Sequence, residues 1–440
     1  MERRGAEAQR GIGDGRGHAV GRGRGAVAWW RDSQSPPPSR SCAVAFGGRR
    51  DSRNPDSRAL RYSPSRRRLN RMPNTLLDSM THEAARFLDS LDPIQRGRAT
   101  RPFADERERT EWYYTPNARP GIPLIELDAP QQQAARRLLH SGLSEGGYNT
   151  AATIMGLEAI LDPVEHWRPG PFPGYDQAAK SIVRDPAMYF VCVFGNPGEE
   201  RWGWSFGGHH VSVHYTIVGD QAAASPCFFG AHPAVSPLQP GFFLEPLAAE
   251  RKLGLELLHL LDAGQRARAT IAAKAPYDIA TANRARVTEG DLPMKPWEIM
   301  RIPPYERRWQ AEFAHLPLED AAREPFRISS QPSGLPARAM TPPQREALAE
   351  LVAVYLGRVP AEAAHAHLAH AARDIDAFHF AWAGADSWQH AHYYRIQGPR
   401  TLIEYDSPYD DGCHIHAVWR DPEGDFGYDL LARHHAEAHR

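Results

Sequence analysis

The chain has 440 residues, of which 42% are hydrophobic and 24% charged, and its formal net charge at pH 7 is −1. This is the composition of a soluble globular protein with a large core, and the length predicts two or three domains. It excludes a collagen-like chain, a wholly disordered chain and a small disulfide scaffold.

The first 71 residues differ from the rest of the chain. They contain 17 Arg, no Lys and six acidic residues, a net charge of +11, so that 35 basic and 47 acidic residues leave 72–440 with −12. The segment is rich in Gly, Arg, Ser and Pro and has no periodic apolar pattern, which predicts disorder. It is either an arginine-rich nucleic-acid-binding arm or, the interpretation we favour, translated upstream DNA before a true start at Met72.

Cysteine usage and hydropathy narrow the class further. The four cysteines lie far apart with no C-x-x-C pair, which argues against a zinc ribbon, an iron–sulfur site or a disulfide framework. Neither candidate start is followed by the apolar region of a signal peptide, and no apolar run is long enough to span a membrane. We therefore expect a cytoplasmic protein.

The predicted elements of the first half come in the order helix, helix, strand, hairpin. In "FLDSLDPIQRGRAT" (87–100) one apolar helix ends near a Leu-Asp, and the Asp can cap the next helix. A helix started by Pro follows in "DAPQQQAARRLLHSGLS" (128–144). The strand-like run "AMYFVCVFG" (187–195) and the hairpin "WGWSFGGHHVSVHYTIVGD" (202–220) complete the series.

The second half repeats this order. "LLHLLDAGQRARAT" (257–270) matches 87–100 at eight of fourteen positions, and "TPPQREALAELVAVYLG" (341–357) parallels 128–144. The hairpin "YRIQGPRTLIEY" (394–405) aligns without gaps on 204–215, after the strand-like "AFHFAWAG" (377–384). We predict an α+β protein of antiparallel hairpins flanked by helices, with internal duplication and pseudo-two-fold symmetry. Its halves, 80–245 and 246–435, pack as one globular unit.

The segment between these elements, 271–337, is rich in Pro and Arg. Irregular connections of this length inside a compact domain are often functional loops or lids. Trp297 and Trp309 lie in it; they either cover a site or pack the loop against the core.

Four motifs in order, "WGWSFGGHHVSVHYTIVGD", "PCFFGAHPA", "HYYRIQGPRTLIEYD" and "HIHAVWRDPEGDFGYDLL", resemble the DUF3500 family over about residues 80–435. The family is defined by sequence and not by activity, so the resemblance implies no catalytic role. The chain departs from the family after "IEYD", where an Asn-rich stretch is replaced by "SPYDDGC" with Asp410 and Asp411.

Histidines dominate the candidate chemistry. In "HHVSVHY" the strand period of two places His209 and two valines on a core face, and His210, Ser212 and His214 on the other. "HIH" places His414 and His416 on one side of a strand, and "WQHAHYYR" contains a further H-x-H pair at 390 and 392. Neutral imidazoles so arranged are suitable ligands for Zn, Fe or Mn. A structural role competes, because many of the 21 histidines are expected on solvated surfaces.

These residues predict a metal-dependent enzyme. We expect His210, His214, His414 and His416 to bind a divalent metal ion, with Glu404 as ligand or general base. Arg395 and Arg400 would bind a small anionic substrate that metal-activated water hydrolyses. Iron or copper would favour oxidation instead. A metal-free cleft binding a small ligand and a partner-binding module remain alternatives, and we expect neither specific nucleic-acid nor membrane binding by the folded region.

Overall fold

The computed structural model describes residues 75–165, 184–300, 310–311, 313–314, 316–409 and 411–438. The arginine-rich segment 1–71, Trp309 and Asp410 lie outside these residues. The described residues belong to one unit, Ser65–Arg440, and residues 80–245 and 246–435 both contribute strands to its main sheet.

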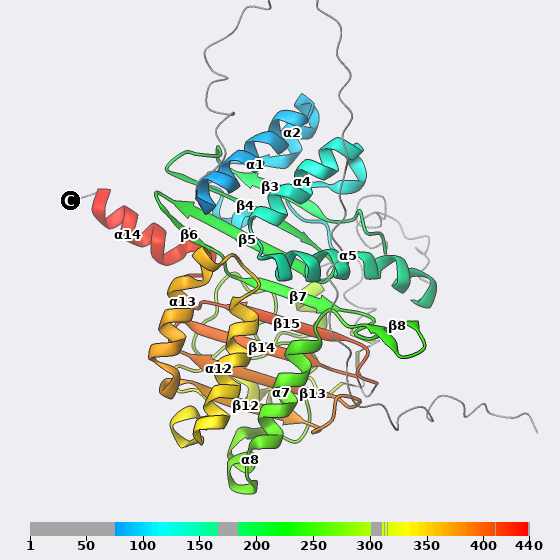
Figure 1. Ribbon diagram of the computed structural model, residues 1–440, viewed down its shortest axis with the longest axis vertical. Coiled ribbons are helices and arrows are strands. Elements are labelled where there is room, and N and C mark those ends of the chain that lie inside the picture. Colours follow the sequence, from blue (N-terminus) through cyan, green and yellow to red (C-terminus); the bar gives the residue numbers. More distant parts are fainter. Residues whose placement is uncertain are drawn as a thin grey trace, which may run out of the picture. The chain divides into compact units, whose positions relative to one another are not determined.

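A large mixed sheet runs through this unit (Figure 1). Its strand order is β1-β3-β4-β5-β7-β15-β14-β13-β12-β10, with β2, β6 and β11 paired to β3, β5 and β12. Among the described strands, β1 pairs with β3 and β10 pairs with β12 in parallel. The other strand pairs of this sheet are antiparallel. The sheet strands are β1 (Thr100–Arg101), β2 (Ile122–Pro123), β3 (Phe190–Phe194), β4 (Arg201–Gly208), β5 (Val211–Val218), β6 (Gln221–Ala223), β7 (Cys227–Ala231), β10 (Thr270–Ala272), β11 (Leu335–Pro336), β12 (His379–Gly384), β13 (His392–Gly398), β14 (Thr401–Ser407) and β15 (Ile415–Arg420). A separate hairpin is formed by β8 (Ser236–Gln239) and β9 (Phe242–Leu244).

The α-helices are α1 (Leu76–Ser90), α2 (Pro93–Ala99), α3 (Glu106–Thr110), α4 (Ala129–Ser141), α5 (Glu145–Glu165), α7 (Ala248–Leu260), α8 (Ala263–Ala269), α9 (Pro296–Met300), α11 (Asp320–Arg323), α12 (Pro342–Leu356), α13 (Ala361–Arg373) and α14 (Tyr428–Ala438). Short 3-10 turns are η2 (Leu124–Glu126), η4 (Glu324–Phe326), η5 (Ala337–Ala339), η6 (Ile375–Ala377) and η7 (Asp425–Gly427). The predicted class, α+β with hairpins flanked by helices, is confirmed at this level, although the sheet is mixed.

The caps predicted from the "LD" motifs are present. Asp92 and Asp262 form capping boxes at the starts of α2 and α8, with Gln95 and Gln265 as the reciprocal partners. Each of these glutamines also bonds a glutamine in the first turn of a later helix, Gln131 of α4 or Gln344 of α12. One polar side chain thus satisfies a helix end and ties two helices together.

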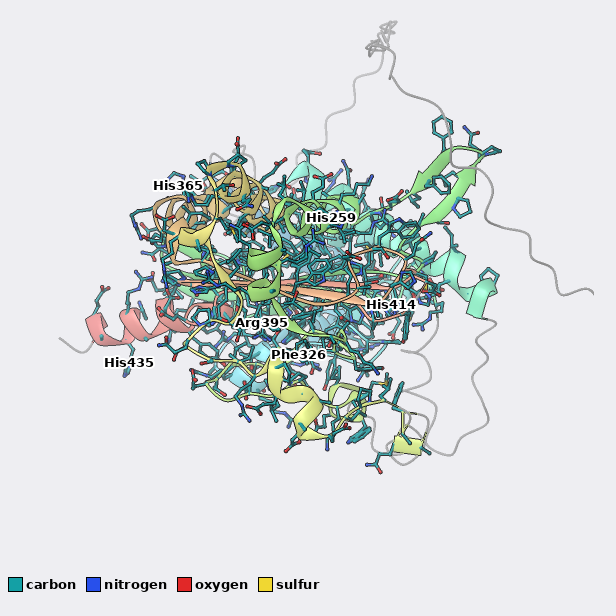
Figure 2. All side chains as sticks on the ribbon, turned by 90° about the horizontal axis from the view of Figure 1, so that it is seen from below. His259, Phe326, His365, Arg395, His414 and His435 are labelled. Carbon is teal, nitrogen blue, oxygen red and sulfur yellow. The ribbon has the colours of Figure 1, made fainter. Side chains whose placement is uncertain are left out.

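The sheet separates two differently built layers. Helices α1, α4, α5, α7, α12 and α13 cover one face (Figure 1), and Val211, Val213 and Tyr215 pack in the same core as these helices. The predicted valine face is therefore confirmed. Long connections cover the other face, where Trp112 and Ile279 contribute to one apolar cluster and Phe326 to another. Figure 2, which views the sheet edge-on, shows Phe326 on this side.

The close approach of α7 to the sheet gives a stability prediction. A Cβ at buried Gly254 would overlap the ring of Tyr394, whereas a Cβ at exposed Gly156 in α5 would meet nothing within 4 Å. We expect Gly254→Ala to lower the free energy of unfolding by about 1–3 kcal/mol through overpacking. Gly156→Ala should raise it by about 0.5–1 kcal/mol because alanine favours a helix. Urea unfolding measures both, and equal effects would contradict the packing of α7.

Candidate metal centre

His210 lies in a turn rather than on a strand. β4 ends at Gly208 and β5 begins at Val211, so His209 and His210 form the two-residue turn of this hairpin. His210 has a φ of 64°, a left-handed conformation that is uncommon for a residue with a side chain. Its backbone N–H donates to the Tyr114 carbonyl (2.9 Å) and its carbonyl accepts from Gly230 (2.7 Å). The prediction that His210 shares a strand face with His214 is therefore wrong.

Gly230 makes room for the His210 imidazole. A Cβ at Gly230 would lie 2.8 Å from Cδ2 of His210, closer than real Cβ contacts. Gly230 is in β7, directly opposite His416 of the neighbouring β15. The missing side chain lets the His210 ring lie over β7 beside His416.

Three histidines converge at this place. The Nε2 atom of His414 lies 2.9 Å from Nε2 of His210 and 3.1 Å from Nε2 of His416, and the third pair is 3.3 Å apart. His210 and His416 are buried and His414 is half-buried. Figure 2 shows His414 toward the end of the sheet opposite to α14. This cluster can hold a metal ion, and the predicted H-x-H pair supplies two of its members.

A carboxylate fixes the orientation of His416. Nδ1 of His416 lies 2.7 Å from Asp278, whose other oxygen accepts a hydrogen bond from Tyr114 (2.8 Å). An imidazole that donates Nδ1–H to a carboxylate presents its Nε2 lone pair, which is the arrangement that surrounds many metal-bound histidines. Sequence reasoning missed Asp278, because it lies in the long connection 271–337 with no motif around it.

His209 packs against His210 and is not itself a member of the three-histidine cluster. The two imidazole rings stack with centroids 3.7 Å apart. Nδ1 of His209 lies 2.6 Å from the buried carboxylate of Glu158 in α5 and 3.2 Å from Arg184. The expectation that His209 shares the valine face is wrong, because it too lies in the turn.

The environment keeps the imidazoles of His210 and His414 neutral. Burial lowers the pKa of His210 and His414 well below the ordinary value of 6.5, and the neighbouring imidazoles lower it further. A neutral ring offers a lone pair to a metal ion, whereas a protonated ring does not.

Asp406 lies on the other flank of His416. It occupies β14 directly opposite His416 of β15, is fully buried, and neither carboxylate oxygen has a hydrogen-bond partner. Burial, and after it the carboxylates of Asp278 and Glu404, raise its pKa well above 3.8. A buried carboxyl group without partners is costly unless it serves a bound group.

The other predicted site residues lie elsewhere. His214, the fourth predicted ligand, is not part of the cluster: its Nε2 bonds Ser212 (2.9 Å), and its ring lies edge-on to Trp112 and Phe426. Glu404 accepts from the backbone N–H groups of Ala280 and Thr281, the Thr281 hydroxyl and Tyr393. Its carboxylate ties the long connection to the sheet.

The two predicted substrate-binding arginines have internal partners. Arg395 is buried and donates to Tyr393 and to the Phe326 and Arg327 carbonyls. Arg400 lies in the β13–β14 turn and binds Asp421 and Asp429. Asp406 follows Arg400 by six positions, about 20 Å along an extended strand.

The comparisons with known proteins agree with the sequence motifs. Residues 74–428 match the family described as "Protein of unknown function (DUF3500)". The chain belongs to the DUF3500 family. No curated protein and no solved structure matches the chain. The family therefore accounts for nearly the whole folded region and gives no activity. In the "SPYDDGC" stretch, Asp411 accepts a hydrogen bond from the Cys413 backbone (2.9 Å).

Within the described residues, no helix has the length and apolarity needed to cross a membrane.

The buried neutral histidines predict an acid-sensitive fold. Burial lowers the pKa of His214 to about 3, so the unfolded chain takes up a proton near pH 6.5 that the folded chain does not. For metal-free protein we expect the free energy of unfolding to fall as the pH drops below about 6.5. His214→Gln should reduce this slope by up to about 1.4 kcal/mol per pH unit. Urea unfolding between pH 7.5 and 5 measures it.

The matched control is His140→Gln, because His140 is exposed on α4. An unchanged slope in His214→Gln would show that His214 is protonated in the folded protein.

Proposed function

We propose that His210, His414 and His416 bind one divalent transition metal ion, and that this centre hydrolyses a small anionic substrate. The observation that carries the proposal is the convergence of three Nε2 atoms at 2.9, 3.1 and 3.3 Å from one another. A metal about 2.0–2.1 Å from each nitrogen requires nitrogen–nitrogen separations of about 2.8 to 3.4 Å, from octahedral to tetrahedral angles.

The surroundings support a metal rather than a hydrogen-bonded histidine cluster. Asp278 orients the His416 lone pair inward, and burial keeps His210 and His414 neutral. Three imidazoles leave coordination positions for water and substrate, which is typical of catalytic rather than structural sites. Bound zinc, iron or manganese would supply Lewis acidity to a water or substrate oxygen.

We assign proton transfer to Asp406 in place of Glu404. The oxygens of Glu404 are occupied by four donors, whereas those of Asp406 have no partner. Asp406 lies beside His416 on the same face of the sheet. In its ionised form it would accept a proton from the attacking water, and the resulting carboxylic acid would return that proton to the leaving group.

Arg184 supports an anionic substrate. Its guanidinium lies 3.2 Å from His209, and its charge is one of the influences that, after burial, lower the pKa of His209 and His414. A positive group beside His209, which stacks on His210, attracts an anion to the centre. Arg184 therefore takes the role that Arg395 and Arg400 were predicted to have.

The proposed centre lies where two halves meet, and we infer that these halves arose by duplication. The strand order supports this inference. At one end of the sheet the short strand β1 is parallel to β3, and the hairpin of β4 and β5 comes next. At the other end the short strand β10 is parallel to β12, and the hairpin of β13 and β14 comes next. The two hairpin turns have the same length, and their second residues, His210 and Arg400, both have positive φ values.

Metal analysis tests the proposed ligands. We expect purified full-length protein to contain close to one transition metal ion per chain, and His414→Ala or His416→Ala to lose it. His214→Gln should retain it, since His214 lies outside the cluster. Elemental analysis by mass spectrometry measures the content and identifies the metal. Full metal content in His416→Ala, or loss in His214→Gln, would contradict the three-histidine site.

Asp406→Asn tests the assigned proton transfer. We expect the variant to keep its metal and to hydrolyse substrate about 100-fold or more slowly, the usual effect of removing a general acid or base. A panel of chromogenic carboxylate and phosphate esters supplies the assay. An unchanged rate would exclude Asp406 from the reaction, and equal rates with and without metal would contradict metal dependence.

A further inference from the structure

Four buried polar atoms lack partners on the helix-covered face of the second hairpin. They are Nη1 of Arg251, Nε2 of His392, the hydroxyl of Tyr405 and the hydroxyl of Ser407. Arg251 in α7 is 7% exposed, and the three strand residues are at most 1% exposed. Each unsatisfied group costs free energy when it is buried, and four such groups in one region point to a ligand that satisfies them.

The four groups lie together. His392 and Ser407 face each other across β13 and β14, and the rings of His392 and Tyr405 stack at 5.4 Å. Burial dominates the pKa of both His392, which it lowers to about 4, and Tyr405, which it raises. The positive charge of Arg251 also acts on both. Arg251 therefore lies within electrostatic range of both rings.

The fold does not require polar residues here. His392 and Ser407 lie seven positions before and after the β13–β14 turn. In the β4–β5 hairpin the residues at the same distance from the turn are Trp202 and Ile217, a buried apolar pair. The inner pair is similar in both hairpins: Trp204 with Tyr215, and Tyr394 with Tyr405. The polar groups therefore distinguish the second hairpin.

The donors and acceptors define the complementary ligand. Nδ1 of His392 donates to the His390 carbonyl (2.7 Å), so Nε2 is an acceptor that needs an O–H or N–H group. Arg251 uses Nη2 to bind Glu245 and places its guanidinium 4.8 Å from the ring of Trp388. Its Nη1 remains to donate to an oxygen.

Arg251 can bind a ligand carboxylate while it binds Glu245, because one guanidinium can bind two carboxylates. Arg400 does so with Asp421 and Asp429.

We propose that Arg251, His392, Tyr405 and Ser407 form a second binding site, for a small carboxylate that also carries a hydroxyl group. The carboxylate accepts from Arg251 and from the Tyr405 and Ser407 hydroxyls, and the ligand hydroxyl donates to His392. This site is separate from the metal centre, because Tyr405 and Ser407 point to the opposite side of β14 from Asp406. Trp388, 40% exposed in the 385–391 loop, packs against the Arg251 guanidinium.

Calorimetric titration of the full-length, metal-loaded protein with glycolate tests the site. We expect one glycolate per chain, with affinity at least about tenfold weaker in Arg251→Met and in Ser407→Ala, the usual effect of losing a hydrogen bond to a charged group. Acetate, which lacks the hydroxyl, should bind about tenfold more weakly. Ser407→Ala removes one oxygen only and decides the question if Arg251→Met fails to fold.

Two controls separate this site from others. Arg266→Met removes a guanidinium that lies 3.5 Å from Asp386 in the same loop and should leave glycolate binding unchanged. His414→Ala should also leave it unchanged, whereas lost binding there would place glycolate at the metal and overturn the proposal. Absence of glycolate binding, equal affinity for acetate, or a crystal structure with only ordered water between the four groups would overturn it as well.

Discussion

The antiparallel pairing of β7 with β15 is the contact on which the candidate centre depends. It joins the two halves of the sheet at its middle and sets Gly230 directly opposite His416. Because Gly230 has no side chain, the His210 ring reaches over β7 to His416, although the two histidines are 206 residues apart. On the other flank, the next strand supplies Asp406. Gly230, His416 and Asp406 thus form one row across three strands, fixed by backbone hydrogen bonds.

The two faces of the sheet follow different physical rules. The helix-covered face is closed mainly by apolar packing, whereas the loop-covered face buries charges that must be paired. Glu404 accepts from four donors, and Arg420 donates from Nε to Asp425 and from Nη2 to the Arg284 carbonyl. Such pairs hold irregular chain against a sheet without a continuous core. Against this background Asp406 stands out, because its carboxyl is equally buried and has no partner.

Sequence periodicity predicted which side chains share one face of a strand, because local backbone geometry determines this. Alternation in "HHVSVHY" identified the core-facing valines, and "HIH" identified two members of the histidine cluster. Periodicity failed at His209 and His210, because they form the turn itself and a His-His pair is not the glycine-containing sequence that usually marks a two-residue hairpin turn. It also missed Asp278 and Glu158. Their roles arise from a long connection and a helix packing against the sheet, and no spacing in the chain records those contacts. His214 was predicted from its pattern alone, and tertiary packing against Trp112 and Phe426 gives it different neighbours.

The two hairpin turns show how one backbone serves two purposes. His210 and Arg400 occupy the same turn position with φ values of 64° and 56°. Arg400 uses that position for an ion pair with Asp421 and Asp429 that fastens the end of β15 to α14. His210 uses it to direct an imidazole over β7. If the halves share an origin, a metal centre required no new backbone: a histidine at an existing left-handed position, a glycine beneath it and the H-x-H pair on the next strand suffice. The same reasoning applies on the helix side, where exchanging an apolar pair for His392 and Ser407 creates a polar cluster within an unchanged hairpin.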